Sequence, residues 1–229
     1  RVWNQYMVER LLKMRLQQSA VDECVFYYKN SVMIVYTDDC IIMGPDSKQL
    51  DKLFQKLQRS FDITLEGTLC DYLGIRIKKE GSNTITLTQP HLIASILKDL
   101  GLDKPNTNAV DTPAVAKKII AQDLHEPEHD ELQFDYRSVI GKLNFLEKST
   151  RPEIAESVHQ CARFSANPRR SHTEAVKRIG RYLKGTSTQG IIMTPGDTES
   201  FDCWVDSSHA GEWKREGAED DPSTARSRM

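Results

Sequence analysis

The stretch VMIVYTDDCIIMG, residues 32–44, constrains the fold more than any other part of the chain. Two apolar runs, rich in β-branched residues, lie on either side of Thr37, Asp38 and Asp39. Such runs favour strands, and so short a connection between them requires a tight antiparallel hairpin. The connection lacks the glycine of the strong Asn-Gly and Asp-Gly turn signals. Turn chemistry therefore explains the two adjacent carboxylates only weakly.

Two interpretations of this acidic pair remain open. In one, Asp38 and Asp39 form an acidic turn that water solvates. In the other, the apolar flanks indicate mostly buried strands, so both carboxylates stand on a rigid platform of the kind that suits a hard divalent cation. Proteins bind Mg²⁺ through one or two carboxylates together with substrate phosphates, and two such ions can clamp the attacking and leaving oxygens of nucleotidyl transfer.

The rest of the chain predicts an α+β fold. Strands are expected over 24–29, 31–36 and 40–44, and a second hairpin is expected within 71–88, with Leu73, Ile75 and Ile77 pointing inward. Helices are expected from the apolar periodicity and from capping residues. Their expected ranges are 1–18, 48–60 with Ser47 as cap, 90–100, 136–148, a helix from 150 with Thr150 and Glu153 as a capping box, and 173–184.

Composition limits the class of protein. The 229 residues suffice for one large domain or two smaller ones, and a net charge of −2 argues against a polyanion binder overall. No apolar run approaches the ~20 residues of a membrane span, and no signal peptide is visible. The five cysteines never occur as C-x-x-C, so we expect reduced, mostly buried thiols in an intracellular protein.

The segment 137–184 is locally basic, with eleven Lys and Arg residues against four Glu. On its last helix Lys177, Arg181 and Lys184 share one face, and Arg178 flanks them. This face is either a solvated helix surface or a set of contacts to nucleic-acid phosphates. Both interpretations stay open.

One motif match is rejected. HEPEH, residues 125–129, fits the H-E-x-x-H pattern of zinc proteases, which requires a helix that places both imidazoles on one face. Pro127 disfavours a helix there, and no apolar stripe flanks the motif. We therefore expect no zinc site.

The chain resembles the copia-type retrotransposon polyproteins in four collinear blocks. Tyr36-Thr37-Asp38-Asp39 is similar to the Y-x-D-D box of reverse transcriptases, and RVWN at the start is similar to the end of the template-contacting motif. DYLGIRI with LTQPHLIASILKDLGL resembles palm and primer-grip segments. DYRSVIGKLNFL, TRPEIAESVHQCARFSANP and AVKRIGRYLKGT resemble thumb and connection helices, and WVDSSHAGEW resembles the first strand of a ribonuclease H domain.

The resemblance implies a domain plan and a function. It implies the C-terminal part of a polymerase palm over 1–88, a helical thumb and connection over 89–190 with a loop at 103–134, and a truncated start of ribonuclease H over 191–229. The implied activity is RNA-directed DNA polymerisation with Mg²⁺ or Mn²⁺ on a template–primer duplex and dNTP. Asp38 and Asp39 are the implied catalytic metal ligands, Asp206 the first ribonuclease H ligand, and Leu73 and Gly74 the primer grip. For Gly74 the alternative is a structural role, either in a strand bulge or where another segment approaches the strand closely.

The differences between this chain and the family are informative as well. Family polymerases carry another metal-binding Asp on a strand before the template motif, together with fingers, and this chain begins after that point. We therefore expect the chain alone to be inactive. The alternative function is a non-catalytic, nucleic-acid-binding relic. Partners are expected in the rest of the polyprotein but not in a membrane, and the family's location is cytoplasmic, in virus-like particles, or nuclear.

Overall fold

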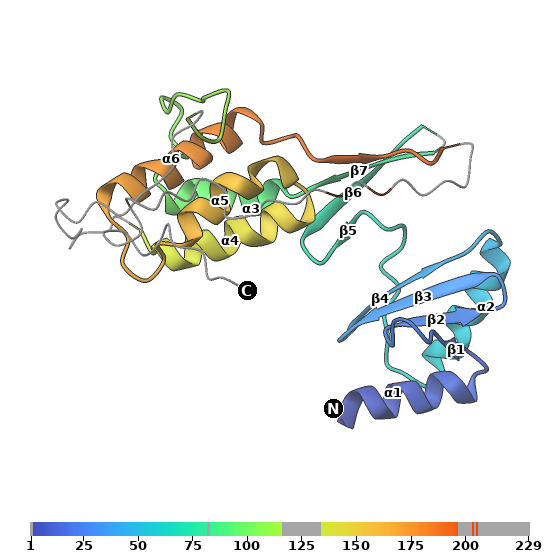
Figure 1. Ribbon diagram of the computed structural model, residues 1–229. Helices are drawn as coiled ribbons and strands as arrows, with labels where there is room; N and C mark the ends of the chain where they lie inside the picture. The colour runs from blue at the N-terminus through green and yellow to red at the C-terminus, as the bar shows by residue number, and fades with distance from the viewer. Residues whose placement is uncertain (1, 82, 116–133, 197–202, 204, 206–229) are drawn as a thin grey trace. The chain divides into compact units, whose positions relative to one another are not determined.

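The computed structural model describes residues 2–81, 83–115, 134–196, 203 and 205 of the chain. Its contacts divide the chain into two compact units, which are residues 1–69 (unit 1) and 70–229 (unit 2). The described part is a mixed α+β structure with six α-helices and two antiparallel four-stranded sheets (Figure 1). The predicted α+β class is therefore confirmed.

Unit 1 is a four-stranded sheet with two helices packed against one face. Its elements are α1 (Val2–Lys13), β1 (Gln17–Gln18), β2 (Val25–Tyr28), β3 (Ser31–Tyr36), β4 (Asp39–Met43) and α2 (Ser47–Gln58). The strands lie in the order β1-β2-β3-β4, so β3 is central and β4 is an edge strand. One apolar cluster joins sheet and helices: Leu11, Leu16, Phe26, Met33, Val35, Leu53 and Leu57.

The hairpin predicted over 32–44 is confirmed, and two local predictions in unit 1 are wrong. The first helix ends at Lys13, because Arg15 adopts a left-handed backbone (φ 68°), and Gln17–Gln18 then pair with β2. Asp46, not Ser47, caps α2: its side chain accepts hydrogen bonds from the backbone N–H groups of residues 48 and 49.

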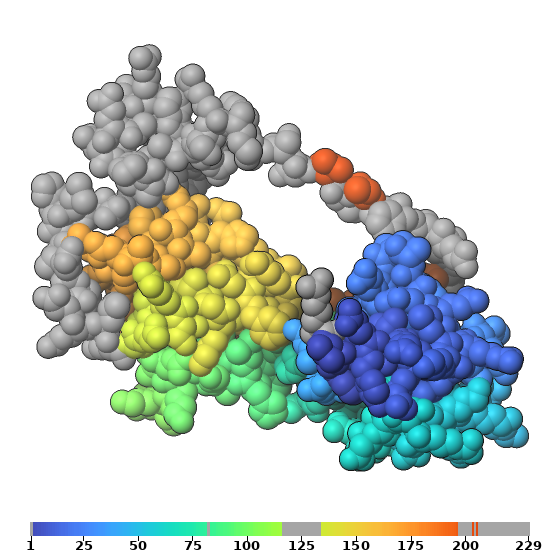
Figure 2. Space-filling model, turned by 90° about the horizontal axis from the view of Figure 1, so that it is seen from below, coloured from blue at the N-terminus to red at the C-terminus, as the bar shows by residue number. Residues whose placement is uncertain are grey.

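Unit 2 combines a hairpin sheet with a helical bundle. Its elements are β5 (Asp71–Tyr72), β6 (Ile75–Glu80), β7 (Thr84–Thr88), α3 (Pro90–Asp99), α4 (Tyr136–Ser149), the 3₁₀ helix η1 (Pro152–Ile154), α5 (Ala155–Ala162), α6 (Arg170–Gly185) and β8 (Ile191–Met193). The helices pack side by side in Figure 2, with α3 in green, α4 in yellow and α6 in orange. The sheet order is β5-β6-β7-β8, so the strand after α6 returns to pair with β7.

The helical periodicity predicted the bundle core correctly. The positions of α4 that were predicted to form its apolar face are all buried: Tyr136, Val139, Ile140, Leu143 and Leu146. The same holds for Val176, Ile179 and Leu183 on α6. α6 also approaches the end of α3 closely at Gly180, where a Cβ would lie 2.6 Å from Leu100 Cδ1.

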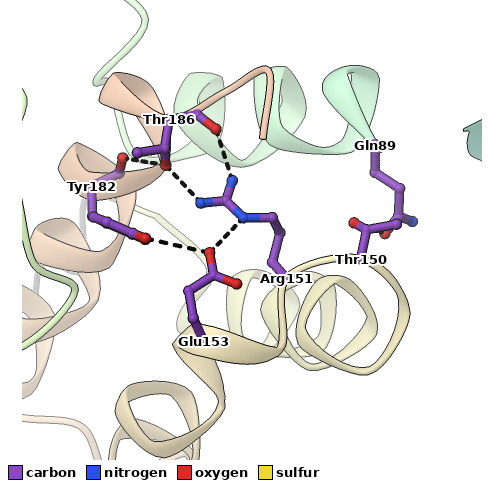
Figure 3. A network of polar contacts seen from close by, with 6 residues as sticks. All are labelled: Gln89, Thr150, Arg151, Glu153, Tyr182 and Thr186. Atoms are coloured by element: carbon purple, nitrogen blue, oxygen red, sulfur yellow. Dashed lines mark hydrogen bonds and ion pairs between the residues drawn. The ribbon is translucent and has the colours of Figure 1, made fainter. Parts of the chain in front are cut away.

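The predicted capping box at 150–153 is wrong, because α4 continues to Ser149 and Thr150 ends that helix. The Thr150 hydroxyl donates to Gln89 Oε1 at 2.9 Å, and Glu153 binds the buried guanidinium of Arg151 at 2.6 Å (Figure 3). Arg151 also donates to the carbonyl and hydroxyl oxygens of Thr186 at the end of α6. A helical segment does follow, as η1 from Pro152 and then α5, but Thr150 does not cap it, and the TRPE segment also ties the ends of three other helices together.

Further sequence predictions are corrected or lie outside the described residues. Most cysteines are not buried: Cys161 is, whereas Cys24, Cys40, Cys70 and Cys203 are exposed. Residues 103–115 of the predicted loop contain no helix or strand, and residues 116–133 are not described. The same holds for all but Val205 of WVDSSHAGEW, the segment predicted to form the first ribonuclease H strand. No described helix has the length and apolar character needed to cross a membrane. The functional boundaries at 88 and 190 stay predictions.

Candidate metal and nucleic-acid site

The acidic pair lies at the tip of the β3–β4 hairpin. Tyr36 is the last paired residue of β3 and faces Asp39, so Thr37 and Asp38 form a two-residue connection. Such short connections favour a positive φ at a central residue, and Thr37 has a φ of 54°. This φ is rare for a β-branched residue. The tip is thus held in one unusual backbone conformation.

The strand register decides which way the acidic residues face. In β3, Met33 and Val35 are buried under the helices, and the alternate residues Val32, Ile34 and Tyr36 lie on the opposite face. Directly paired residues share a face, so Asp39 lies with Tyr36 on the side that the helices of unit 1 do not cover. We call this side the open face of the sheet.

Both carboxylates are free to bind a ligand. Asp38 and Asp39 are exposed, and within the described residues neither has a hydrogen-bond or ion-pair partner. The neighbouring Cys40 faces Val35 on the covered side of the sheet. Partial burial, and to a lesser degree the Asp39 carboxylate, raise the pKa of the Cys40 thiol. The thiol is therefore protonated at neutral pH and is no competitor for a hard cation.

The donor set fits Mg²⁺ or Mn²⁺ in chemistry and supplies part of a coordination shell. Two adjacent aspartates on a short, well-paired hairpin offer hard oxygen ligands that need not break other bonds first. Among the described residues, no group of three or more His, Cys, Asp or Glu side chains is arranged to hold a metal ion. Within the described residues β4 is the edge of its sheet, so no neighbouring strand pairs with its outer backbone groups beside Asp39.

One contact at the tip was not predicted from the sequence. The indole Nε1 of Trp3, near the start of α1, donates a hydrogen bond of 3.2 Å to the carbonyl oxygen of Thr37. In Figure 1 the first turn of α1 lies beside the end of the sheet where β3 turns into β4. The two residues are 34 positions apart, and no local pattern pairs them.

The predicted primer-grip residues occupy a turn and not a strand. Leu73 and Gly74 connect β5 to β6, with Tyr72 facing Ile75, and both have positive φ (51° and 77°). Leu73 therefore does not continue the inward alternation of Ile75 and Ile77, and the prediction that it does is wrong. A two-residue connection with both φ positive is a type I′ turn, for which Gly74 is suited. This turn belongs to unit 2.

The basic face of α6 is less available than its sequence suggests. The Lys184 ammonium donates to the carbonyl oxygens of Leu102 (3.0 Å) and Lys104. Arg178 donates to the Thr112 hydroxyl at 2.9 Å, and Lys177 lies 3.8 Å from Glu174. Within the described residues, Arg181 has no hydrogen-bond or ion-pair partner. A role of this face in phosphate binding stays a prediction, and Lys184 is already used to hold the loop after α3.

Two predicted features lie outside the described residues. They are Asp206, the implied ribonuclease H ligand, and the rejected zinc motif at 125–129.

Comparison with known proteins identifies the chain. A family model described as Reverse transcriptase (RNA-dependent DNA polymerase) matches residues 1–116, which include the hairpin of the acidic pair. The Retrovirus-related Pol polyprotein from transposon TNT 1-94 of Nicotiana tabacum is 31% identical over 83% of this chain and 15% of its own length. The corresponding polyprotein from transposon RE1 of Arabidopsis thaliana is 28% identical over 93% of this chain and 14% of its own.

A yeast relative is matched over more of its own length. Putative transposon Ty5-1 protein YCL074W of Saccharomyces cerevisiae is 24% identical over 91% of this chain and 68% of its own length. No solved structure gives a significant match. The family model covers the acidic hairpin and just over half of the chain, and the two plant polyproteins match 83% and 93% of the chain. The chain therefore belongs to the reverse transcriptase (RNA-dependent DNA polymerase) family, in its copia-type retrotransposon branch.

Proposed function

We propose that unit 1 is part of the palm of an RNA-directed DNA polymerase and that Asp38 and Asp39 are two of its metal-binding carboxylates. The observation that carries this proposal is the hairpin tip, where two partner-free carboxylates stand on paired strands above a closed core. The helices cover one face of the sheet, so the other face is left for a nucleic-acid substrate. The family match over residues 1–116 supports the same assignment.

The proposed cofactor is Mg²⁺, or Mn²⁺ in its place. When bound, such ions stabilise the attacking and leaving oxygens of nucleotidyl transfer. The chain's own part is to hold two oxygen ligands in a fixed place. Asp39 is positioned by its pairing with Tyr36, and Asp38 by the two-residue connection. A third carboxylate from another segment of the polyprotein would complete the set, and the unpaired edge of β4 gives a strand carrying it a place to dock.

The remaining assignments are proposals of the same kind. Residues 1–88 would belong to the palm, 89–190 to thumb and connection, and 191–229 to the start of a ribonuclease H domain with Asp206 as its first ligand. Leu73 and Gly74 would contact the primer, and the basic face of α6 the phosphates of the template–primer duplex. Since Lys184 holds backbone carbonyls, Lys177 and Arg181 are the residues of that face to test.

Metal binding tests the central assignment directly. Mn²⁺ titration followed by water-proton relaxation should detect one weak site in the purified chain. Asp38→Asn or Asp39→Asn should each weaken it by at least about tenfold, because ligand charge sets affinity at such sites. Asp51→Asn is the matched control, since Asp51 is an exposed aspartate of the same unit and lies on α2. Equal affinity in all four proteins would refute the assignment.

Primer extension tests the activity. We expect the chain alone not to extend a primer on an RNA template with Mg²⁺ or Mn²⁺, because two carboxylates make an incomplete clamp. A longer polyprotein segment that contains this chain should extend it and should lose at least about a hundredfold in rate on Asp38→Asn. Robust extension by the chain alone, lost in Asp38→Asn, would contradict the first expectation. Salt-sensitive duplex binding without extension by either protein would instead favour the nucleic-acid-binding relic.

A further inference from the structure

The backbone at the hairpin tip is one that its own sequence does not favour. Thr37 has a φ of 54°, in the left-handed region that Gly and Asn tolerate and that a β-branched residue avoids. Such a conformation persists only where surrounding contacts hold it in place. The backbone pairing of Tyr36 with Asp39, at the end of the β3–β4 hairpin, supplies one such constraint. The other constraint must come from outside the hairpin.

Trp3 supplies that constraint. Its indole N–H donates to the Thr37 carbonyl oxygen at 3.2 Å. This carbonyl belongs to the same planar peptide unit as the backbone nitrogen of Asp38. A bond that holds the oxygen therefore fixes the orientation of the whole unit and, with it, the direction in which the Asp38 side chain leaves the backbone.

The indole ring is itself held on two sides. Tyr6, one helical turn further along α1, stacks on it with ring centroids 5.9 Å apart. Phe61, which follows α2, meets it edge to face at 6.3 Å and meets Tyr6 in the same manner. Arg10 covers Tyr6, with its guanidinium carbon 4.5 Å from the ring centroid. We call Trp3, Tyr6 and Phe61 the aromatic cluster.

The aromatic cluster is not an ordinary piece of core. Trp3 is 46% exposed and Tyr6 is 42% exposed, and α1 forms part of the surface of unit 1 in Figure 2. Burial of apolar area therefore accounts for only part of this arrangement. The stacking geometry and the single polar contact of the indole are better explained if the cluster serves to aim that N–H at the tip.

We propose that Trp3 is a positioning residue for the metal-binding carboxylates. The inference rests on the proposed function of Asp38 and Asp39 and deepens it. Trp3 touches neither the metal ion nor the substrate. It acts through the Thr37 carbonyl, and its removal leaves both carboxylates in place but lets the peptide between Thr37 and Asp38 rotate.

The test uses the full chain and the Mn²⁺ titration. Trp3→Phe removes the N–H and keeps an aromatic ring in the stack. Tyr6→Phe is the matched control, because it also changes one ring of the aromatic cluster to phenylalanine but leaves the hydrogen bond to Thr37 intact. We expect Trp3→Phe to weaken Mn²⁺ binding by about twofold to tenfold, the range of one neutral hydrogen bond. Tyr6→Phe should stay within about twofold of the wild type.

A rescue separates positioning from a general loss of stability. Asn tolerates a left-handed backbone, so Thr37→Asn lets the tip keep its shape without the indole. In the Thr37→Asn background, Trp3→Phe should therefore change Mn²⁺ affinity less than in the native background. Circular dichroism at the titration temperature should show the same folded fraction in every variant. A purely structural role of Trp3 would give no rescue.

A measurement on the unaltered chain guards against a variant that fails to fold. The chain has three tryptophans, and Trp3→Phe assigns the Trp3 indole signal in a ¹H–¹⁵N spectrum. Mn²⁺ at the acidic pair should broaden this signal at substoichiometric metal, and Asp38→Asn should abolish the broadening.

The outcomes are distinct. Unchanged affinity in Trp3→Phe, with binding lost in Asp38→Asn, would overturn the positioning role and leave the proposed function standing. Absence of broadening at the Trp3 signal during binding that depends on Asp38 would overturn it as well. Equal Mn²⁺ binding by wild type and Asp38→Asn would instead refute the proposed function, and this inference with it.

Discussion

Replacing Arg151 should destabilise unit 2 more than any exposed charge could. The Arg151 side chain is only 1% exposed, yet it carries a charged guanidinium between the end of α4 and the end of α6. Its Nε lies 2.6 Å from Glu153, and its two other nitrogens donate to the Thr186 carbonyl (2.9 Å) and hydroxyl (2.6 Å) (Figure 3). Its guanidinium carbon also lies 5.5 Å from the ring centroid of Tyr182.

The size of the effect follows from these contacts. Hydrogen bonds from a charged donor contribute about 1.5–3 kcal/mol each, so the two bonds to Thr186 account for about 3–6 kcal/mol. Glu153 is 41% exposed and regains water when its partner is lost, so this ion pair adds little. We expect Arg151→Ala to lower the free energy of unfolding by about 3–5 kcal/mol, the range for breaking a buried pair on one side.

Urea unfolding followed by circular dichroism at 222 nm measures this loss. Arg151→Met keeps most of the buried volume and removes every donor, so the difference between the Met and Ala variants reports packing alone. Arg163→Ala is the control, because Arg163 is exposed and its hydrogen bond joins it to Gln160 within one helical turn. It should change stability by no more than about 0.5 kcal/mol.

A result below about 1 kcal/mol for Arg151→Ala would refute the reasoning. It would show that water or a neighbouring side chain satisfies the carbonyl of Thr186 and the carboxylate of Glu153 as well as the guanidinium does. A double-mutant cycle with Thr186→Ala would then locate the error, since this second change removes the hydroxyl and leaves the carbonyl in place.

Three further predictions concern single positions in unit 2. Gly190→Ala should lower the melting temperature markedly, because its Cβ would lie 1.9 Å from the Leu87 carbonyl oxygen and force β8 away from β7; an unchanged melting temperature would contradict the close approach. Leu73→Asn should stabilise unit 2 by about 1 kcal/mol in urea unfolding, because Asn-Gly is the preferred type I′ pair and Leu at a φ of 51° is strained; a loss of stability would show that the leucine side chain packs usefully. Burial raises the pKa of Cys161 to about 12 from 9.0, so above pH 9 the unfolded chain releases this proton while the native chain keeps it, and stability falls as pH rises from 9 to 12. Unfolding at pH 8 and pH 10 should therefore show a smaller decline in Cys161→Ala than in the wild type, and equal declines would refute this assignment.

Local patterns in the sequence determined the elements of this protein. The apolar runs on either side of Thr37, Asp38 and Asp39 predicted a tight hairpin, and the structure has it, with Asp39 already paired in β4. Helical periodicity gave the buried faces of α4 and α6, because the side chains at every third and fourth position must share one side. The Y-x-D-D box and the blocks that follow it were enough to place the chain in its family.

The tertiary structure decided how those elements are used. Asp39 faces the open side of the sheet because it pairs with Tyr36 and because the helices cover the other side. The order of the strands makes β4 an edge strand. The contacts of polar side chains could not be predicted from the sequence either. Lys184, predicted to bind phosphate, instead donates to backbone carbonyls, and Arg151 is buried. The bond from Trp3 to Thr37 spans 34 positions. Which surfaces pack together after folding decides the strand order, the burial of a charge and the contacts between distant residues. A local sequence pattern does not specify which surfaces pack together.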